Sequence, residues 1–183
     1  MTGGWIEQYP DDVKAIAAAG HELGNHSENH KQMSTLSSEE CKKELMTPHE
    51  KVKKLTGIDM KVFRPPYGDY NDTLITTVRE CGYSPIQWDV DSLDWKDYDA
   101  ATITQRVTSS VGPGSIIHTV LDHKHLGNGS IILCHNGAKY TAEALEQLID
   151  GLQSKGFTLV KMSDLIYKDH YDINPEGRQQ HIK

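Results

Sequence analysis

Short apolar segments alternate with amphipathic helical segments along this chain, and this alternation restricts the fold more than any other feature of the sequence. Apolar side chains recur at helical spacing in residues 10–20, 37–57, 72–82, 99–111 and 141–156. Strands are expected in the apolar segments 60–63, 83–90, 129–135 and 157–162, and a last helix is expected from Ser163. Strands that alternate with helices of this length form β-α-β units, so the sequence predicts an α/β fold with a parallel sheet.

Local signals mark the ends of two of the expected helices. Ser37 and Glu40 have the spacing of a capping box, and Gly57 is placed to end the same helix. Pro48 lies inside this segment and is expected to kink the helix or divide it in two. Asn71 is placed to cap the helix that follows.

The composition is that of a globular domain and argues against two classes of partner. The 183 residues are 37% hydrophobic and 25% charged, which is enough chain to bury a core. A net charge of −7 without a basic cluster argues against a nucleic-acid partner. No apolar run approaches the roughly 18 residues of a transmembrane segment, so no transmembrane segment is expected.

Cys41, Cys81 and Cys134 have no C-x-x-C spacing and are expected to be buried free thiols.

Polar residues follow the expected strands at their carboxyl ends. They are His26, Arg64, the segment 89–95 and His135. In parallel α/β folds ligands bind at this edge of the sheet, so these residues are expected to cluster on one rim. A barrel explains such a rim better than an open sheet does, although the sequence does not decide between them.

The segment HELGNHSENH contains the strongest candidate metal ligands. His26 and His30 are four residues apart, and two histidines at this spacing commonly supply half of a zinc site. The alternative is a pair of exposed histidines in a polar loop. Zinc normally takes a third protein ligand; Glu28 is expected to point away from the pair, and His21 and Asp91 are more distant candidates.

Three further segments have both a functional and a structural interpretation. Arg64 in RPPYG could serve a site or form a structural ion pair beside a stiff turn. The carboxylates of DVDSLDW could serve a site or form a solvated acidic turn, with Trp95 packed on the core. His135 in ILCHNG could be catalytic or a hydrogen-bonded core histidine.

Taken together and in this order, the motifs resemble those of the polysaccharide deacetylases, the NodB-homology domain. They are H-[ST]-x-x-H at 26–30, R-x-P-Y-G at 64–68, D-x-x-D-W at 91–95 and L-x-H at 133–135. The resemblance covers residues 1–167, which are expected to be the deacetylase domain, and leaves 168–183 as a polar tail, of which 172–183 is expected to be frayed. It implies a distorted (β/α) barrel with fewer than eight strands.

The resemblance also implies a function. Members of the family are metal-dependent hydrolases that remove N-acetyl groups, and sometimes O-acetyl groups, from chitin-like sugars, peptidoglycan or xylan. The divalent metal, most often zinc with cobalt, nickel or iron as alternatives, polarises the amide carbonyl and activates water. An acetylated polysaccharide or oligosaccharide is therefore the expected substrate.

Each motif residue receives a role from the resemblance. His26 and His30 would bind the metal, and His135 would be the general acid that protonates the leaving amine. Arg64 would orient the catalytic base, and Asp94 would tune His135. The remaining positions would contact the substrate, with Tyr67 giving its backbone N–H to the oxyanion, Leu133 and Trp95 lining the acetyl-methyl pocket, and Asp91 beside them.

One motif of the family is absent from this sequence. The pattern T-F-D-D-G supplies the catalytic base and the third metal ligand, and no D-D-G occurs here. Asp11 and Asp12 begin a helix and do not replace it. The chain is therefore expected to lack the N-terminal strand or strands of the barrel, to bind metal weakly and to have little activity. Exposed sheet edges would favour a homodimer or strand-swapped assembly.

Three hypotheses follow for the function. The first is a carbohydrate N-deacetylase of the extracellular space or cell wall, although the chain shows no signal peptide. The second is a non-catalytic descendant that binds glycan or metal, and the third is a structural α/β domain. His118, His123 and His125 lie in a segment between two GSII repeats that is expected to be an insertion, and surface solvation is the simplest explanation for them.

Overall fold

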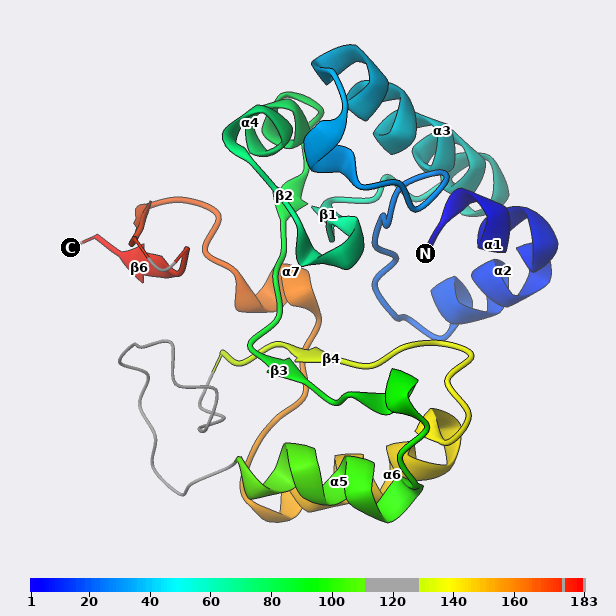
Figure 1. The fold of residues 1–183 in the computed structure, drawn as a ribbon, viewed down its shortest axis with the longest axis vertical. Coiled ribbons are helices and arrows are strands. Elements are labelled where there is room, and N and C mark those ends of the chain that lie inside the picture. The colour runs from blue at the N-terminus through cyan, green and yellow to red at the C-terminus, as the bar shows by residue number, and fades with distance from the viewer. Residues whose placement is uncertain (111–128, 176, 183) are drawn as a thin grey trace. The chain divides into compact units, whose positions relative to one another are not determined.

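The computed structural model of the chain describes residues 1–110, 129–175 and 177–182 (Figure 1). His118, His123 and His125, with most of the expected insertion, lie outside the described residues. The chain forms two compact units, each described here by itself. The N-terminal unit comprises Met1–Gln87 and Lys161–Asp164, and the C-terminal unit comprises Trp88–Val160 and Leu165–Lys183.

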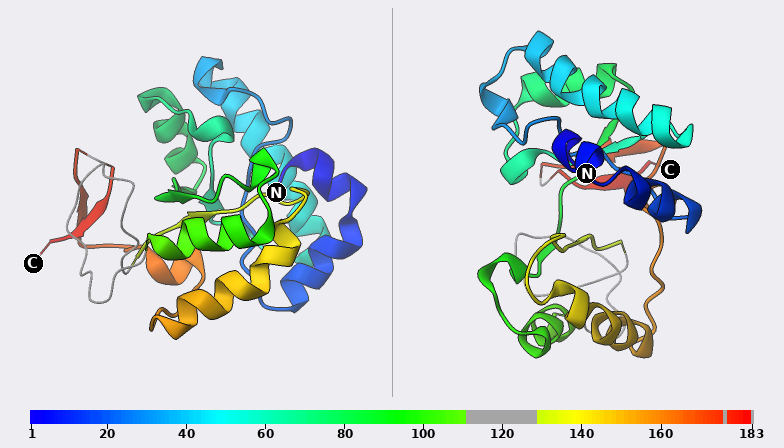
Figure 2. Two further views of the ribbon diagram at one scale, coloured as in Figure 1. Left: turned by 60° about the horizontal axis from the view of Figure 1, so that its bottom comes forward. Right: turned by 90° about the vertical axis from the view of Figure 1, so that its right-hand side faces the viewer.

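The N-terminal unit is built around one long helix. In order along the chain, its helices are α1 (Gly3–Gln8), α2 (Pro10–Ala18), α3 (Ser38–Thr56) and α4 (Asp72–Glu80), with the 3-10 turns η1 (Met33–Thr35) and η2 (Pro66–Gly68). Helix α3 packs against α1, α2 and α4, as Figures 1 and 2 show. The buried side chains between them include Ile6, Leu45 and Phe63. Helix α1 was not predicted from the sequence, because its two leading glycines disfavour a helix.

A pair of short parallel strands lies beside these helices. Strand β1 (Val62–Phe63) pairs with β2 (Ser84–Pro85), and Asn25 forms a parallel bridge with Phe63 on the other side of β1. Three segments therefore run side by side, and the segment that carries His26 is one of them. Helix α7 (Met162–Leu165) begins at the second residue of the N-terminal unit's short segment Lys161–Asp164.

The C-terminal unit has its own core. Strand β3 (Val90–Asp91) is parallel to β4 (Ile132–Leu133), and the 3-10 turn η3 (Asp94–Lys96) follows β3. Helices α5 (Ala100–Ser109) and α6 (Thr141–Ser154) pack on each other. The chain then forms an antiparallel hairpin of β5 (Tyr171–Ile173) and β6 (Gln179–His181).

The predicted α/β organisation is confirmed, because both pairs β1–β2 and β3–β4 are parallel. Among the described residues the strands form two-stranded sheets and do not close into a barrel. The expected strand 83–90 is two strands, β2 and β3, separated by residues 86–89.

Several local predictions can now be compared with the structure. The capping box at Ser37 and Glu40 is present, Gly57 adopts the left-handed conformation at the end of α3, and Asn71 caps α4. Helix α3 runs through Pro48 as one element, so of the two expected effects of this proline, a kink or a division, the division does not occur. Packing of this helix against three others offsets the loss of one backbone hydrogen bond.

Two predictions near the C-terminus are also wrong. Residues 157–161 are not a strand, because no described strand pairs with them, and Leu159 and Val160 are about half exposed. The tail expected to be frayed instead contains the β5–β6 hairpin. The side chain of Gln179 supports it through hydrogen bonds to both the N–H and the carbonyl of Tyr167, and Arg178 forms an ion pair with Asp89.

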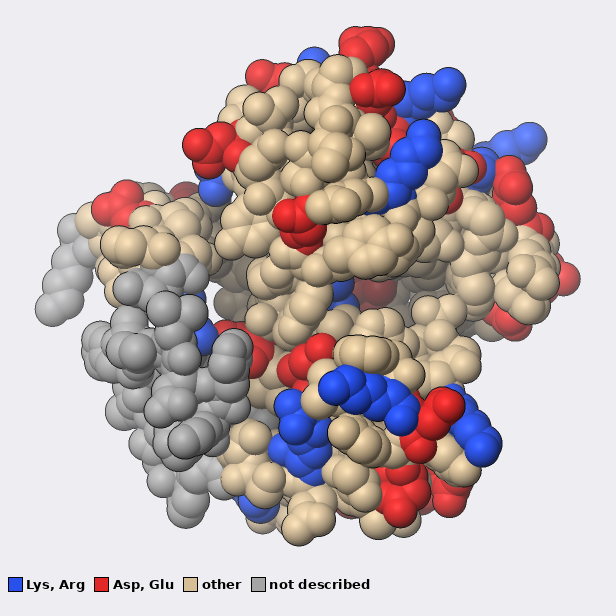
Figure 3. Space-filling view, viewed as in Figure 1, with Lys and Arg blue, Asp and Glu red and all other residues tan. Residues whose placement is uncertain are grey.

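Two surface properties bear on the predicted partners. On the face shown in Figure 3, Lys and Arg side chains are interspersed among Asp and Glu side chains. Within the described ranges, none of the helices has the length and apolar character needed to span a membrane.

The capping box yields a stability prediction. Replacing Ser37 with alanine removes the hydroxyl that accepts the N–H of Glu40, so the free energy of unfolding should fall by about 1 kcal/mol. Urea denaturation would measure the change. Ser38→Ala, at the first position of the same helix, is the matched control and should leave the midpoint nearly unchanged. Equal midpoints for the two variants would contradict the prediction.

Candidate active site

The H-x-x-x-H loop begins where its segment leaves strand β1. The N–H of Asn25 donates to the carbonyl of Val62 (2.9 Å), and the N–H of Arg64 donates to the carbonyl of Asn25 (3.0 Å). His26 is the next residue, and it follows the bridge to β1 just as Arg64 follows β1 itself. The two motifs therefore leave neighbouring parallel segments in the same direction, as their positions after expected strands predicted.

The imidazoles of His26 and His30 lie against each other. Their ring centroids are 4.8 Å apart, with the planes inclined by 73°. The Nδ1 atom of His26 is 2.7 Å from the carbonyl oxygen of Arg64, so this nitrogen carries the proton and Nε2 is left as the acceptor. Burial lowers the pKa of His26 to about 4. The ring is therefore neutral near pH 7, which is the form that binds a metal.

This histidine pair fits a divalent metal, with two protein ligands. A backbone carbonyl that fixes the tautomer of a ligating histidine is a usual feature of metal sites. However, the described part of the chain contains no group of three His, Cys, Asp or Glu side chains that could hold a metal ion. Within the described residues the pair therefore offers two candidate ligands, and metal binding by them stays a prediction.

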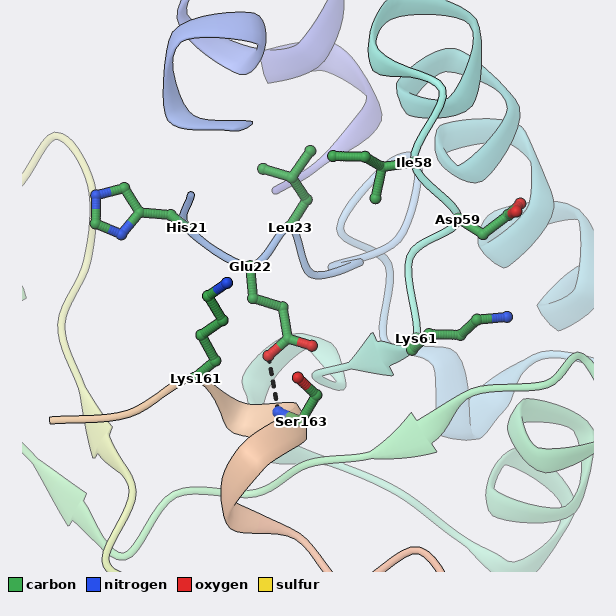
Figure 4. A pocket seen from close by; sticks show the side chains of 8 residues that line it. All are labelled: His21, Glu22, Leu23, Ile58, Asp59, Lys61, Lys161 and Ser163. Carbon is green, nitrogen blue, oxygen red and sulfur yellow. Dashed lines mark hydrogen bonds between the residues drawn. The ribbon is translucent and has the colours of Figure 1, made fainter. Parts of the chain in front are cut away.

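The sequence offered three other candidates for a third ligand. The carboxylate of Glu28 forms an ion pair with Lys51, which also binds Glu7 (2.8 Å), so this candidate already has a charged partner. Asp91 belongs to the C-terminal unit. His21 is exposed and lines a separate hollow of about 240 Å³ with Glu22, Lys61, Lys161 and others (Figure 4).

That hollow lies at the opposite end of β1 from the histidine pair. Lys61, which lines it, precedes β1, whereas Arg64 follows β1. The carboxylate of Glu22 accepts the N–H of Ser163 there at 2.9 Å, so this charge already has a structural partner (Figure 4). We therefore place the candidate active site at the other end.

The R-P-P-Y-G segment forms the turn η2 beside His30. The N–H of Gly68 donates to Pro65 and that of Asp69 donates to Pro66, so neither bond uses the N–H of Tyr67. Tyr67 has φ 61° and ψ 4°, a left-handed conformation. Its ring contacts that of His30, with centroids 4.7 Å apart, and 68% of the residue is exposed. The role of this backbone N–H at the site stays a prediction.

The C-terminal unit holds His135 through a buried carboxylate. Asp94 is fully buried, and its Oδ1 lies 2.7 Å from Nδ1 of His135. Its Oδ2 accepts the backbone N–H of His135 (2.7 Å) and the hydroxyl of Thr141 (2.6 Å). Because Nδ1 is engaged by Asp94, the half-exposed ring of His135 presents Nε2 for proton transfer.

The same contacts set the charge of Asp94. Burial alone would raise the pKa of this carboxyl. The hydrogen bonds from Thr141 and from the backbone and ring of His135 outweigh burial and hold the pKa of Asp94 below its ordinary value. Asp94 is therefore an ionised carboxylate that orients His135. The side chain of His135 is 42% exposed, so it does not lie in the core as the structural alternative expected.

The remaining motif residues surround this pair along β3 and β4. Asp91 is in register with Leu133, and the N–H of Ser92 donates to the carbonyl of Leu133. The carboxylate of Asp91 accepts the N–H of Leu93 (2.9 Å), so Asp91 shapes the turn that carries Asp94. Leu133 is buried.

Trp95 follows Asp94 in the same turn, and 55% of it is exposed. It is therefore not packed on the core, which was the structural alternative. The Nζ atom of Lys96 lies 5.1 Å from the centroid of its ring. A contact of this exposed indole with substrate stays a prediction.

The structure thus assembles the predicted residues in two groups. His26, His30, Arg64 and Tyr67 lie together in the N-terminal unit, and Asp91, Asp94, Trp95, Leu133 and His135 lie together in the C-terminal unit. The convergence of all four motifs on one cation stays a prediction, since two motifs belong to each unit.

Three supporting residues were missed by sequence reasoning. Asn25 and Glu44 hold the histidine loop, and Thr141 holds Asp94. The adjacency of Asn25 to His26 was a weak signal. No local pattern identifies Glu44 or Thr141, because their partners are 15 and 47 residues away.

Comparisons with known proteins identify the class. Residues 1–86 match the family described as polysaccharide deacetylase. The solved structure of peptidoglycan deacetylase PdaC from Bacillus subtilis is 30% identical and superposes with a TM-score of 0.75, covering 90% of this chain and 72% of that one. The chain belongs to the polysaccharide deacetylase family and has its fold. The predicted resemblance and fold class are confirmed.

Other relatives span both active and inactive proteins. The peptidoglycan-N-acetylglucosamine deacetylase of Bacillus cereus is 32% identical over 168 residues, which are 90% of this chain and 56% of that protein. A structure described as a CE4 family pseudoenzyme from Bacillus anthracis is 29% identical, with a TM-score of 0.76 over 90% of this chain and 53% of that one. The chain spans about half the length of the curated relatives it matches.

Proposed function

We propose that this chain is a metal-dependent carbohydrate deacetylase that removes N-acetyl groups from acetylated amino sugars, in peptidoglycan or a chitin-like glycan. The observation that carries the proposal is the hydrogen-bonded pair of Asp94 and His135, because a buried carboxylate that orients a half-exposed imidazole is typical of a general acid. Relatives named as peptidoglycan deacetylases support the choice of substrate.

The histidine pair of the N-terminal unit is the proposed binding site of the divalent ion, which would act as the electrophile. His26 and His30 would hold the divalent ion, for which zinc is the first choice and cobalt, nickel or iron are alternatives. When bound, the ion polarises the acetamido carbonyl and acidifies water. The carbonyl of Arg64 keeps the Nε2 atom of His26 available for it.

The proton transfers fall to the residues of the C-terminal unit. Hydrolysis breaks the bond between the acetyl carbon and the sugar nitrogen, and the departing nitrogen must take up a proton. In the proposed role His135 donates it from Nε2, since its Nδ1 is held by Asp94. The exposed indole of Trp95 and the neighbouring Leu133 would receive the acetyl methyl group.

A second candidate function has its own support. Two histidines without a third ligand in the described residues would hold a metal weakly, and one structural relative is described as a pseudoenzyme. A non-catalytic glycan- or metal-binding protein is therefore the alternative. Under the first proposal we expect low activity from this chain, because the described residues lack a carboxylate placed as the catalytic base.

Acetate release separates the two candidates. The full chain would be assayed on acetylated glucosamine oligomers and on peptidoglycan, with added zinc and with a chelator. We expect a low rate that the chelator removes and that His135→Ala lowers by at least about a hundredfold, which is the usual contribution of a general acid. Glu146→Ala, on the exposed face of α6, is the control and should keep the rate.

The assay has a different outcome for the failure of each of the two candidate functions. No acetate from a chain that still binds the oligomers in calorimetry would favour the non-catalytic function. A rate that His135→Ala leaves unchanged would refute the proposed general acid.

A further inference from the structure

The loop that carries the two candidate metal ligands has a strained backbone. Ser27 has φ 66° and His30 has φ 53°, and neither is glycine. Left-handed backbone of this kind persists only where surrounding contacts impose it. The conformation of the loop, and with it the spacing of His26 and His30, therefore depends on groups that hold Ser27 and His30 in place.

The side chain of Asn25 is the first of these groups. Its Oδ1 accepts the N–H of Ser27 at 2.9 Å, and its Nδ2 donates to the carbonyl of Leu45 on α3 at 2.8 Å. Ser27 in turn accepts the N–H of His30 on its Oγ at 2.9 Å. Both strained residues thus donate to side chains in a chain of hydrogen bonds that starts at Asn25, which is 2% exposed.

Asn25 is itself oriented from the other side of the core. Its Nδ2 also donates to the hydroxyl of Tyr83 at 3.0 Å, and this hydroxyl lies 2.5 Å from Nδ1 of His49. The Nε2 atom of His49 is 3.1 Å from the carboxylate of Asp59, which also binds Lys53. The network runs from an ion pair at the surface, through a buried phenol, to the histidine loop.

One assignment of protons satisfies this whole network. Burial raises the pKa of Tyr83 to about 12, so the phenol keeps its proton. If the neutral ring of His49 carries its proton on Nε2, it donates to Asp59 and accepts from Tyr83. The oxygen of Tyr83 is then free to accept from Asn25. Each donor has one acceptor, which fixes the amide of Asn25 with Oδ1 toward Ser27.

We propose that Asn25, oriented by Tyr83 and His49, is the positioning residue that sets the geometry of the His26–His30 pair. This inference rests on the proposed metal-binding function, but the contacts that carry it do not involve the metal. Asn25 does not touch the reacting atoms; it acts through the backbone of Ser27 and His30.

Tyr83→Phe tests the proposal with a small change. The variant removes one buried hydroxyl, so Asn25 loses a partner while the core keeps its ring. We expect amide hydrogen exchange at Ser27 and His30, followed by NMR, to become about tenfold faster relative to amides within α3. We also expect zinc affinity in calorimetry to fall about tenfold, which is the low end for residues that support metal ligands. Asn25→Ala should produce larger effects of both kinds.

Thr77→Val is the matched control. It removes another buried hydroxyl of the same unit, which donates to the carbonyl of Thr73 within α4 and not to the histidine loop. In this variant the exchange rates of the Ser27 and His30 amides and the affinity for zinc should equal those of the unmodified chain. If Tyr83→Phe exchanges at Ser27 and His30 no faster than Thr77→Val, the proposal is overturned.

The experiment also distinguishes this failure from that of the proposed function. If the unmodified chain and His26→Ala bind zinc equally, the metal site is wrong, and the exchange rates of Ser27 and His30 alone decide whether Asn25 positions the loop. If His26→Ala abolishes zinc binding while Tyr83→Phe speeds exchange without changing zinc affinity, the loop is loosened but the ligands are not displaced, and the positioning role is refuted.

Discussion

Replacing His26 with alanine is expected to lower the affinity of this chain for zinc by more than about a hundredfold, because it removes one of the two proposed ligands. Residues that merely support a ligating histidine change metal affinity about 10- to 100-fold, and loss of the ligand itself should exceed that range. The ring of His26 is poised for binding, since the carbonyl of Arg64 fixes its tautomer and burial keeps it neutral. Isothermal calorimetry with zinc, on metal-free protein near pH 7, would measure the change.

A second histidine of the same segment provides the control. His21 is exposed, five residues before His26, and lines the separate hollow near the start of β1. His21→Ala should bind zinc as the unmodified chain does. Equal loss in both variants, or none in either, would mean that the ion binds elsewhere. In the second case His118, His123 and His125, which lie outside the described residues, would be the next positions to change.

Replacing Asp94 with asparagine is expected to lower the free energy of unfolding by about 2–4 kcal/mol at pH 7. The buried carboxylate accepts three hydrogen bonds, two from His135 and one from Thr141. An amide of the same size turns one acceptor into a donor, which leaves at least one buried donor without an acceptor and removes the charge that attracts the imidazole. Urea denaturation would measure the loss, and His135 should also cease to act as an oriented acid.

The effect of Asp94 should depend on pH in a defined direction. Its pKa is lower in the folded protein than the value of about 3.9 in an unfolded chain. The unfolded state therefore binds the proton first, and the stabilisation is present above about pH 4 and disappears as the pH falls through the lower folded pKa. The difference in stability between the unmodified chain and Asp94→Asn should be large at pH 5 to 7 and shrink at pH 3.

An exposed carboxylate of the same unit completes this test. Asp150→Asn, on α6, should leave the urea midpoint nearly unchanged at each pH. If Asp94→Asn unfolds at the same urea concentration as Asp150→Asn, the network around Asp94 contributes nothing to stability and the interpretation of that network fails.

The local elements of the fold were predictable because their signals are local. The capping box of α3, Gly57 at its end and Asn71 before α4 all appear where the sequence places them. Each acts within one turn of its own helix, so neighbouring residues are sufficient to predict it. The candidate catalytic residues were recognisable for a related reason, since each motif is a short run of residues.

Elements that depend on distant partners were not predictable in the same way. Residues 157–161 have the composition of a strand but no described partner, whereas the polar tail forms a hairpin through the side chain of Gln179. In α6, Leu145 has the spacing of a core residue and is 47% exposed, because the buried face is set by Ala144, Leu148 and Leu152 against α5 and the strands.

The sequence by itself determined the alternation of parallel strands and helices and the identity of the side chains capable of the chemistry, since hydrophobic period and motif spacing are properties of consecutive residues. Only the tertiary structure decided how those side chains are held: which nitrogen of His26 is free, and that Asp94 is locked by Thr141, 47 residues away. It likewise brought Tyr83 to Asn25 across 58 residues. Hydrogen bonds between distant residues form only when the whole core packs, so no short stretch of sequence encodes them.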